Sequence, residues 1–201
     1  MKSVITVGRQ FGCGGRAICK KLSEKLGIPF YDRELIEYAS TKSGISSKVL
    51  EQYDEKATNS LLYSLSLTSY SHFGSSFHTP NLPLNDQLFI SQSEAIKELA
   101  DKGPCIILGR CSDYVLKDRK DVLKVFLYGD EDLRVSHVAE RMGISEAKAK
   151  EITKKTDKRR ASYYNYYTQL KWGDIKNFDL ALNSKIGDDK VVDMIIKCYN
   201  E

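Results

Sequence analysis

The chain has 201 residues, a length that suits one compact domain around a single core. Its 41% hydrophobic and 29% charged residues exclude a disordered or low-complexity protein. No apolar run approaches the roughly 18 to 20 residues that cross a bilayer, and the first ten residues lack the apolar stretch of a signal peptide. We therefore expect a single domain over residues 1–201, cytoplasmic and without a membrane partner.

Strand and helix patterns alternate along the chain. Short apolar runs rich in β-branched residues predict strands, whereas apolar residues at helical spacing, such as Ile18, Leu22 and Leu26, predict amphipathic helices. The expected strands are residues 4–8, 28–32, 105–109, 122–129 and 179–183. The expected helices are residues 16–27, 33–44, 91–103, 131–143 and 188–199. This order predicts a three-layer α/β fold, in which a five-stranded parallel sheet is flanked by helices on both faces.

One stretch follows neither period. Residues 57–85 are rich in serine, threonine and asparagine and contain two prolines. We expect this segment to be a mobile excursion from the domain. Its start, SLLYSLSL, alternates serine and leucine and fits either a helix or a strand.

Cysteine and histidine patterns give no sign of a metal centre or disulfide framework. The five cysteines are scattered, with no C-x-x-C pair, which predicts reduced thiols. The three histidines have no ligand-like spacing with one another or with a cysteine.

The net charge of +4 is unevenly distributed. Between Lys148 and Arg160, seven lysines and arginines stand against Glu151 and Asp157, which gives this segment a charge of +5 and leaves about −1 for the rest. A concentrated positive segment requires an anionic partner or a structural reason.

A glycine-rich turn follows the first expected strand, in V-G-R-Q-F-G-C-G-G-R-A. Glycines at a strand-to-helix turn let successive backbone N–H groups point into one concavity, and the helix adds a partial positive charge. The turn is therefore a candidate phosphate cradle, because its four glycines and two arginines are more than a turn without a ligand requires. The candidate phosphate-binding residues are Gly8, Arg9, Gly12, Cys13, Gly14, Gly15, Arg16 and Ala17.

The turn departs from the P-loop pattern G-x-x-x-x-G-K-S/T. Gly15 occupies the lysine position, Arg16 occupies the Ser/Thr position, and one residue is inserted near Arg9. Either arginine could replace the lysine charge, but neither supplies the hydroxyl that binds magnesium. A dinucleotide-type pattern, G-x-G-x-x-G/A, is also formally met through Ala17, with Asp32 near the ribose, although such short glycine patterns arise easily.

Several motifs together resemble the cytidylate kinase-like family. They are G-R-Q-F-G-C-G-G-R, I-P-F-Y-D-R-E-L-I, G-R-C-S-D-Y-V-L, D-K-R-R-A-S-Y-Y and D-L-A-L-N-S, in order from about Ser3 to Tyr199. The resemblance implies the nucleoside monophosphate kinase fold of the P-loop NTPase superfamily, with a monophosphate-binding excursion and a closing lid over about residues 145–172.

The resemblance also implies roles for particular residues. Arg110 would meet the acceptor phosphate, with Cys111 standing where the family pattern has an acid. Asp157 and Arg160 would bind the ribose and phosphate of the acceptor from the lid. Asp32 would lie near the transferred phosphate and its metal, although its place before a helix also suits an N-cap.

Aromatic residues near the lid have two readings. Tyrosines 163, 164, 166 and 167 could stack on a base, but packing is the commoner outcome at helical spacing. Trp172 is expected in the core. Arg159 and Arg160 point about 100° apart on a helix, and Arg160 is preferred for the site because it lies on one face with Asp157.

The leading functional hypothesis is phosphoryl transfer from ATP to a pyrimidine nucleoside monophosphate, CMP- or dCMP-like, or to a related small acceptor. The expected catalytic residues are Arg16, Asp32, Arg110 and Arg160. Mg²⁺ would be held mainly by the nucleotide and water, with Asp32 assisting. The alternatives are a non-catalytic nucleotide or phosphate sensor and, ranked third, a nucleic-acid binder that uses the positive segment.

Overall fold

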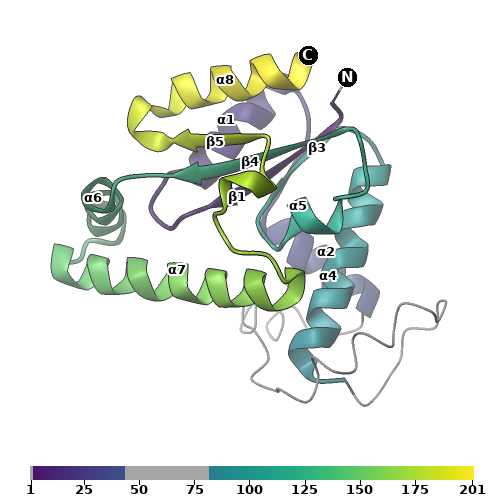
Figure 1. Cartoon of the computed structure of the whole chain (residues 1–201), viewed down its shortest axis with the longest axis horizontal. Helices are drawn as coiled ribbons and strands as arrows, with labels where there is room; N and C mark the ends of the chain where they lie inside the picture. Colours follow the sequence, from purple (N-terminus) through teal and green to yellow (C-terminus); the bar gives the residue numbers. More distant parts are fainter. Residues whose placement is uncertain (1, 44–81) are drawn as a thin grey trace.

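A parallel sheet of five strands forms the centre of the computed structural model, which describes residues 2–43 and 82–201 (Figure 1). The strand order is β2-β3-β1-β4-β5. The strands are β1 (Val4–Arg9), β2 (Phe30–Tyr31), β3 (Cys105–Leu108), β4 (Val122–Tyr128) and β5 (Leu180–Asn183). All five predicted strands are confirmed, and β2 is the shortest.

Helices cover both faces of the sheet, as predicted. They are α1 (Gly15–Leu26), α2 (Arg33–Ser43), α4 (Leu84–Asp101), α5 (Ser112–Val115), α6 (Glu131–Met142), α7 (Glu146–Thr168) and α8 (Asp188–Asn200). Short 3₁₀ turns lie at η2 (Ile175–Asn177) and η3 (Ser184–Ile186). Among the described residues, no helix combines the length and the apolar character that a membrane crossing requires.

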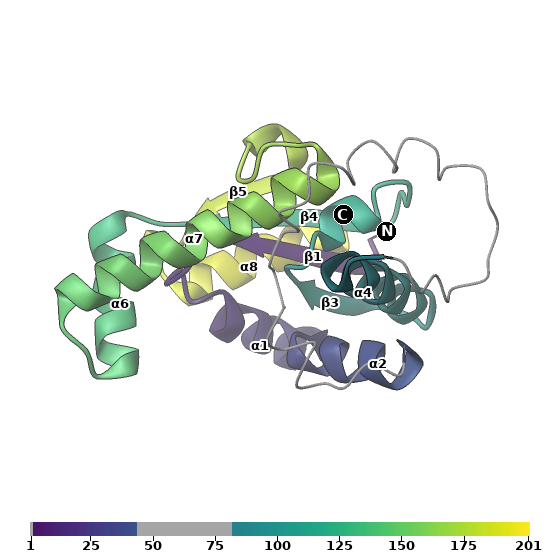
Figure 2. The same ribbon diagram turned by 90° about the horizontal axis from the view of Figure 1, so that it is seen from below.

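The two faces of the sheet bury separate cores, because side chains alternate along each strand. Ile5 and Val7 of β1 pack with α1 and α8. Val4 packs on the opposite face with α2 and α4. In Figure 1, α1 and α8 lie on one side of the sheet and α2 and α4 on the other, and Figure 2 shows the same elements from below. The chain therefore forms the three layers that the alternating pattern predicts.

Helix α4 begins at Leu84, before the predicted start at residue 91. Asp86 and Gln92 are buried in the first turns of α4. Because they are polar, they do not contribute to the apolar spacing that predicts a helix. Residues 57–81 of the expected excursion lie outside the described part of the chain. Residues 84 and 85, also assigned to the excursion, instead form the first turn of α4.

Parallel strands bring their carboxyl ends to one edge of the sheet. In the register Val7 pairs with Leu108, so that Gly8, near the end of β1, lies beside Gly109, which follows β3. Asp32 follows β2, which pairs with the other side of β3. This edge, where loops in α/β sheets bind ligands, therefore collects the motifs that the sequence singled out.

The long helix α7 starts beside α6, near the carboxyl ends of the strands, and reaches α4 at its other end (Figure 1). Ser145 caps the start of the helix, because its hydroxyl accepts a hydrogen bond from the backbone N–H of Lys148. Gln169 caps the other end in the left-handed conformation. The expected lid region, 145–172, thus consists of α7 and the turn after it. Helices α6 and α7 pack against each other as a hairpin joined at Gly143.

Candidate active site

The glycine-rich turn forms a tight connection between β1 and α1. Gly12 and Gly14 have φ values of 88° and 69°, in the left-handed region that favours glycine. The first bond into α1 runs from the Ile18 N–H to the Gly14 carbonyl. In the described part of the chain, the N–H groups of residues 14–17 donate to no protein acceptor, as is usual for the first turn of a helix. These groups are available to an anion.

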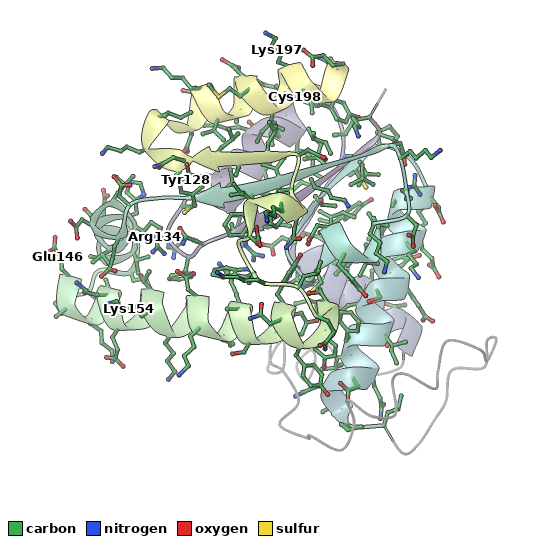
Figure 3. The ribbon with its side chains drawn as sticks, viewed as in Figure 1. Tyr128, Arg134, Glu146, Lys154, Lys197 and Cys198 are labelled. Atoms are coloured by element: carbon green, nitrogen blue, oxygen red, sulfur yellow. The ribbon has the colours of Figure 1, made fainter. Side chains whose placement is uncertain are left out.

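Helices α6 and α7 hold the outer side of this turn. The backbone N–H of Phe11 donates to Asp157 Oδ1 at 2.7 Å. Arg134 of α6, labelled in Figure 3, donates to the Phe11 carbonyl at 3.0 Å and to Asp157 Oδ2 at 2.6 Å. Asp157, expected at the acceptor, therefore lies against the glycine-rich turn and does not line the pocket described below. Sequence reasoning missed Arg134, which reads there as an ordinary helical arginine.

Three of the expected site residues meet at the end of β2. Asp32 is 9% exposed, and its Oδ2 lies 3.3 Å from Arg16 Nε. Its Oδ1 lies 3.5 Å from Nη1 of Arg110, whose side chain is 4% exposed. A buried carboxylate is stable here because two guanidinium groups neutralise it. Ion pairing with both arginines, rather than capping of α2, is the contact that the Asp32 side chain makes.

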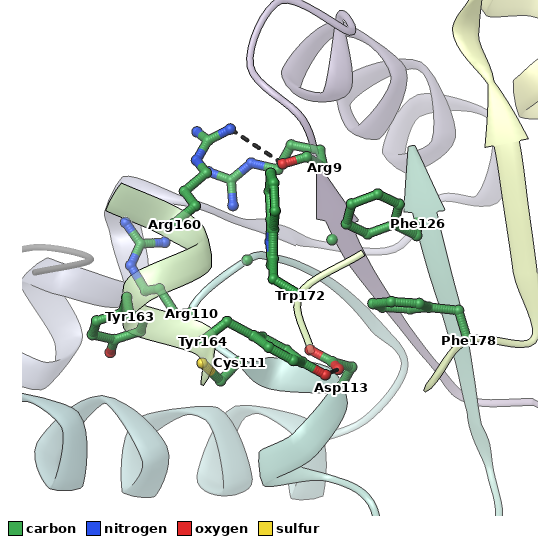
Figure 4. Close-up of a pocket in the computed structure, with 12 residues that line it drawn as sticks. Arg9, Arg110, Cys111, Asp113, Phe126, Arg160, Tyr163, Tyr164, Trp172 and Phe178 are labelled. Carbon is green, nitrogen blue, oxygen red and sulfur yellow. Dashed lines mark hydrogen bonds between the residues drawn. The ribbon is translucent and has the colours of Figure 1, made fainter. Parts of the chain in front are cut away.

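A pocket of about 350 Å³, partly open to solvent, lies between the strand ends and α7 (Figure 4). In Figure 4, Arg110 and Arg160 lie to one side of Trp172, and Phe126 and Phe178 lie to the other. The pocket thus has a cationic part and an aromatic part. It is lined by Gly8, Arg9, Gly109, Arg110, Cys111, Asp113, Phe126, Arg160, Tyr163, Tyr164, Trp172 and Phe178.

The cationic part combines arginines from three elements. Arg110 and Cys111 leave β3 with φ values of 53° and 55°, an unusual conformation for residues with side chains that often marks functional sites. Arg160 of α7 donates from Nη1 to the carbonyl of Arg9 at 3.3 Å. Guanidinium groups in a fixed arrangement are suited to bind phosphate oxygens.

The aromatic part of the pocket joins β4 to the segment after α7. The Phe126 ring lies 5.6 Å from the Trp172 ring, edge to face, and 4.9 Å from the Phe178 ring. The prediction that Trp172 is a core residue is wrong in part, because its half-buried ring lines the pocket. A Cβ on Gly8 would lie 2.8 Å from Phe126, so glycine keeps space for this ring.

The tyrosines of α7 pack against neighbouring side chains, which is the commoner outcome for aromatic residues at helical spacing. Tyr163 donates to Gln92 at 3.2 Å, and Tyr167 stacks on Phe89 with 4.1 Å between ring centroids. Tyr164 donates its hydroxyl to Asp113 Oδ2 at 2.7 Å. Tyr163 and Tyr164 also line the pocket.

Asp113 is a pocket residue that sequence reasoning did not single out. It is buried two residues after Cys111, where the family pattern has an acid, so a carboxyl group is present in the pocket after all. Its position just beyond a buried strand was the available signal. Burial raises the pKa of Asp113, and the hydrogen bond from Tyr164 opposes this rise.

The raised pKa of Asp113 predicts a pH-dependent contribution to stability. Below the ordinary aspartate pKa of about 3.9 the carboxyl is neutral in both states and the contribution is fully present. As the pH rises through the folded-state pKa, the buried group must ionise and the contribution is lost. Asp113→Asn keeps an acceptor for Tyr164 but does not titrate. In urea unfolding, the stability advantage of the natural chain over this variant should therefore be larger at pH 4 than at pH 7. An advantage that grew with pH would contradict the prediction.

Arg160 should contribute to substrate binding more than its neighbour does. Arg160→Met is expected to raise the KM of an anionic substrate about 10-fold or more, because it removes a charge-assisted hydrogen bond. Arg159→Met is the matched control, since Arg159 is exposed and adjacent in the same helix. Steady-state kinetics of both variants measure the difference. Equal KM values for the two would show that Arg160 does not contact the substrate.

The fold is shared with solved kinase structures. The chain aligns with a shikimate kinase structure from Bacteroides thetaiotaomicron at a TM-score of 0.56, with 12% identity over 98% of both chains. It aligns with a gluconokinase structure from Sinorhizobium meliloti at a TM-score of 0.53, with 14% identity over 98% of this chain and 91% of the other. At these identities the likeness shows the fold.

The chain belongs to the cytidylate kinase-like family, which matches residues 4–186. A cytidylate kinase from Archaeoglobus fulgidus is 27% identical over 96% of this chain and 92% of its own length. The crystal structure of an uncharacterized protein from Eubacterium ventriosum is 29% identical and covers 98% of both chains, with a TM-score of 0.71. The family resemblance inferred from the motifs is confirmed.

Proposed function

We propose that this protein transfers a phosphoryl group from ATP to a pyrimidine nucleoside monophosphate, CMP- or dCMP-like, or to a related small acceptor. The observation that carries the proposal is the convergence of Arg110, Arg160 and Asp32 with the glycine-rich turn at one edge of the sheet. Family membership supports a nucleotide kinase, and the relative from A. fulgidus, a cytidylate kinase, supports CMP as the first acceptor to test.

Phosphoryl transfer requires positioning and charge neutralisation more than covalent chemistry. The N–H groups at the start of α1 would bind the phosphates of ATP. Arg110 would bind the acceptor phosphate from the buried end of the pocket, and Arg160 would approach it from α7. The aromatic part, with Trp172 and Phe126, offers a flat apolar surface for a base.

Mg²⁺ would enter with the nucleotide. The described residues include no group of three or more histidine, cysteine, aspartate or glutamate side chains that could hold a metal ion by themselves. Oxygen ligands from phosphates and water are typical of Mg²⁺ in such sites, and Asp32 could add a carboxylate. The ion would neutralise charge on the phosphates, while Asp32 would also hold Arg16 and Arg110 in place.

A non-catalytic nucleotide or phosphate sensor is the second candidate, favoured by the absence of the P-loop lysine and hydroxyl. Nucleic-acid binding has less support, since part of the positive segment is neutralised within the protein. Lys150 and Lys154 contact Glu131 at 2.9 and 3.4 Å, and Lys148 contacts Glu151 at 2.8 Å.

A thermal-shift panel of nucleoside mono- and triphosphates with magnesium tests the proposal, because a ligand that binds only the native state raises Tm. We expect shifts with ATP and with CMP or dCMP, followed by ADP formation when both are present. Binding without ADP formation would support the sensor. No shift with any nucleotide would overturn both candidates.

A further inference from the structure

The missing P-loop lysine leaves open which side chain supplies its charge. Gly15 stands at the lysine position, as the first residue of α1. It is buried and its φ is not in the left-handed region, so the backbone itself does not require glycine there. The reason for glycine at this position must lie in its surroundings.

Arg9 occupies the space beside Gly15. A Cβ added to Gly15 would lie 3.3 Å from Cγ and 3.4 Å from Cβ of Arg9, whereas the next nearest atom belongs to Leu127 at 3.7 Å. Ile5 and Val7 of β1 face α1, and Arg9 follows them on the same side of the strand. The aliphatic stem of Arg9 therefore crosses the start of α1 where a lysine stem would begin.

The charge of Arg9 also lies close to the N-terminal part of α1. Burial raises the pKa of Cys19, one turn into this helix, to about 12, and the charge of Arg9 opposes this rise. Arg9 lines the pocket (Figure 4), and its carbonyl is held by Arg160. Arg9 thus lies between the glycine-rich turn and the pocket.

Arg16, the other candidate for this charge, faces Asp32 at the end of β2. Its Nε lies 3.3 Å from Asp32, and its side chain is 55% exposed. Its stem leaves α1 on the side of β2, away from the stem of Arg9. Arg16 is therefore a poor replacement for a lysine that reaches the β and γ phosphates.

We propose that Arg9 replaces the P-loop lysine, binding the terminal phosphates of ATP from the strand side of the turn, and that Gly15 is glycine to make room for its stem. This inference rests on the proposed function, since it assumes that the turn binds ATP. In this exchange an arginine at the end of β1 takes the place of the lysine at the start of the helix, and glycine stands at the helical position.

ATP and AMP titrations of purified variants test the proposal. Arg9→Met keeps the stem and removes the charge. Lys20→Met is the matched control, because Lys20 is an exposed cation of α1 and its loss changes the net charge by the same amount. We expect Arg9→Met to weaken ATP binding about 10- to 100-fold, as for loss of charge-assisted hydrogen bonds, and to leave AMP binding nearly unchanged. Lys20→Met should change neither.

The double variant Arg9→Ala/Gly15→Lys tests the exchange itself, because removing Cγ of Arg9 leaves room for a lysine at residue 15. We expect the double variant to bind ATP at least tenfold more tightly than Arg9→Ala alone. If the natural chain binds ATP and Arg9→Met binds it equally well, Arg9 is not the replacement and the proposed function stands. If the natural chain does not bind ATP, the proposed function fails and this inference fails with it.

Discussion

Replacing Arg110 with methionine is expected to lower kcat/KM for phosphoryl transfer about 100- to 1,000-fold, the scale of losing one preorganised donor to a charged transition state. Arg110 is almost fully buried, lies 3.5 Å from Asp32 and points into the pocket from the end of β3. Methionine preserves much of the stem volume, so the loss reports the guanidinium. Steady-state kinetics with ATP and CMP measure it.

Two further variants make the Arg110 result specific. Arg110→Lys keeps the charge without the planar fork and should lie between the natural chain and Arg110→Met. Arg119→Met removes an arginine that pairs with Asp101 and Asp121 outside the pocket, and it should leave kcat/KM within about twofold. If Arg110→Met had the same kcat/KM as Arg119→Met, Arg110 would not be part of the active site.

Gly12→Ala should destabilise the protein by roughly 3 kcal/mol and abolish nucleotide binding. Left-handed backbone costs a residue with a side chain about 1 to 2 kcal/mol, and overpacking adds about 1 to 3 kcal/mol. The new Cβ would lie 2.6 Å from the backbone carbonyl oxygen of Arg134, which cannot move without shifting α6. Urea unfolding measures the stability, and ATP titration measures the site.

Gly143→Ala is the matched control for Gly12→Ala. Gly143 has a φ of 63°, but a Cβ there would meet nothing within 4 Å. The Gly143→Ala substitution should therefore cost only the strain of the left-handed backbone, about 1 to 2 kcal/mol, and should leave ATP binding unchanged. Equal losses for the two variants would mean that contact with Arg134 does not restrict the turn.

The fold could be predicted because local pattern and tertiary structure agree. Each strand of the sheet is a short apolar run, and helices such as α1 and α8 keep one apolar face. The start of α4 could not be predicted in this way. Its buried Asp86 and Gln92 accept hydrogen bonds from tyrosine hydroxyl groups of α7, contacts between residues that are more than 70 positions apart in the chain.

The site was most predictable where residues follow a strand directly. Asp32 and Arg110 do so, and the structure brings them together with Arg16. Residues on α6 and α7 were less predictable, because their role depends on how the helices dock. Asp157 turns toward Phe11 and Arg134 instead of the pocket, and neither contact has a signature in the sequence.

Transfer of label from γ-phosphate-labelled ATP to CMP tests most directly whether this sheet edge is a phosphoryl-transfer site. The natural chain should form labelled CDP, and Arg110→Met should label CMP at least 100-fold more slowly. Bound ATP that passes its label to no nucleoside monophosphate, CMP and dCMP included, would contradict the assignment of this sheet edge as a phosphoryl-transfer site.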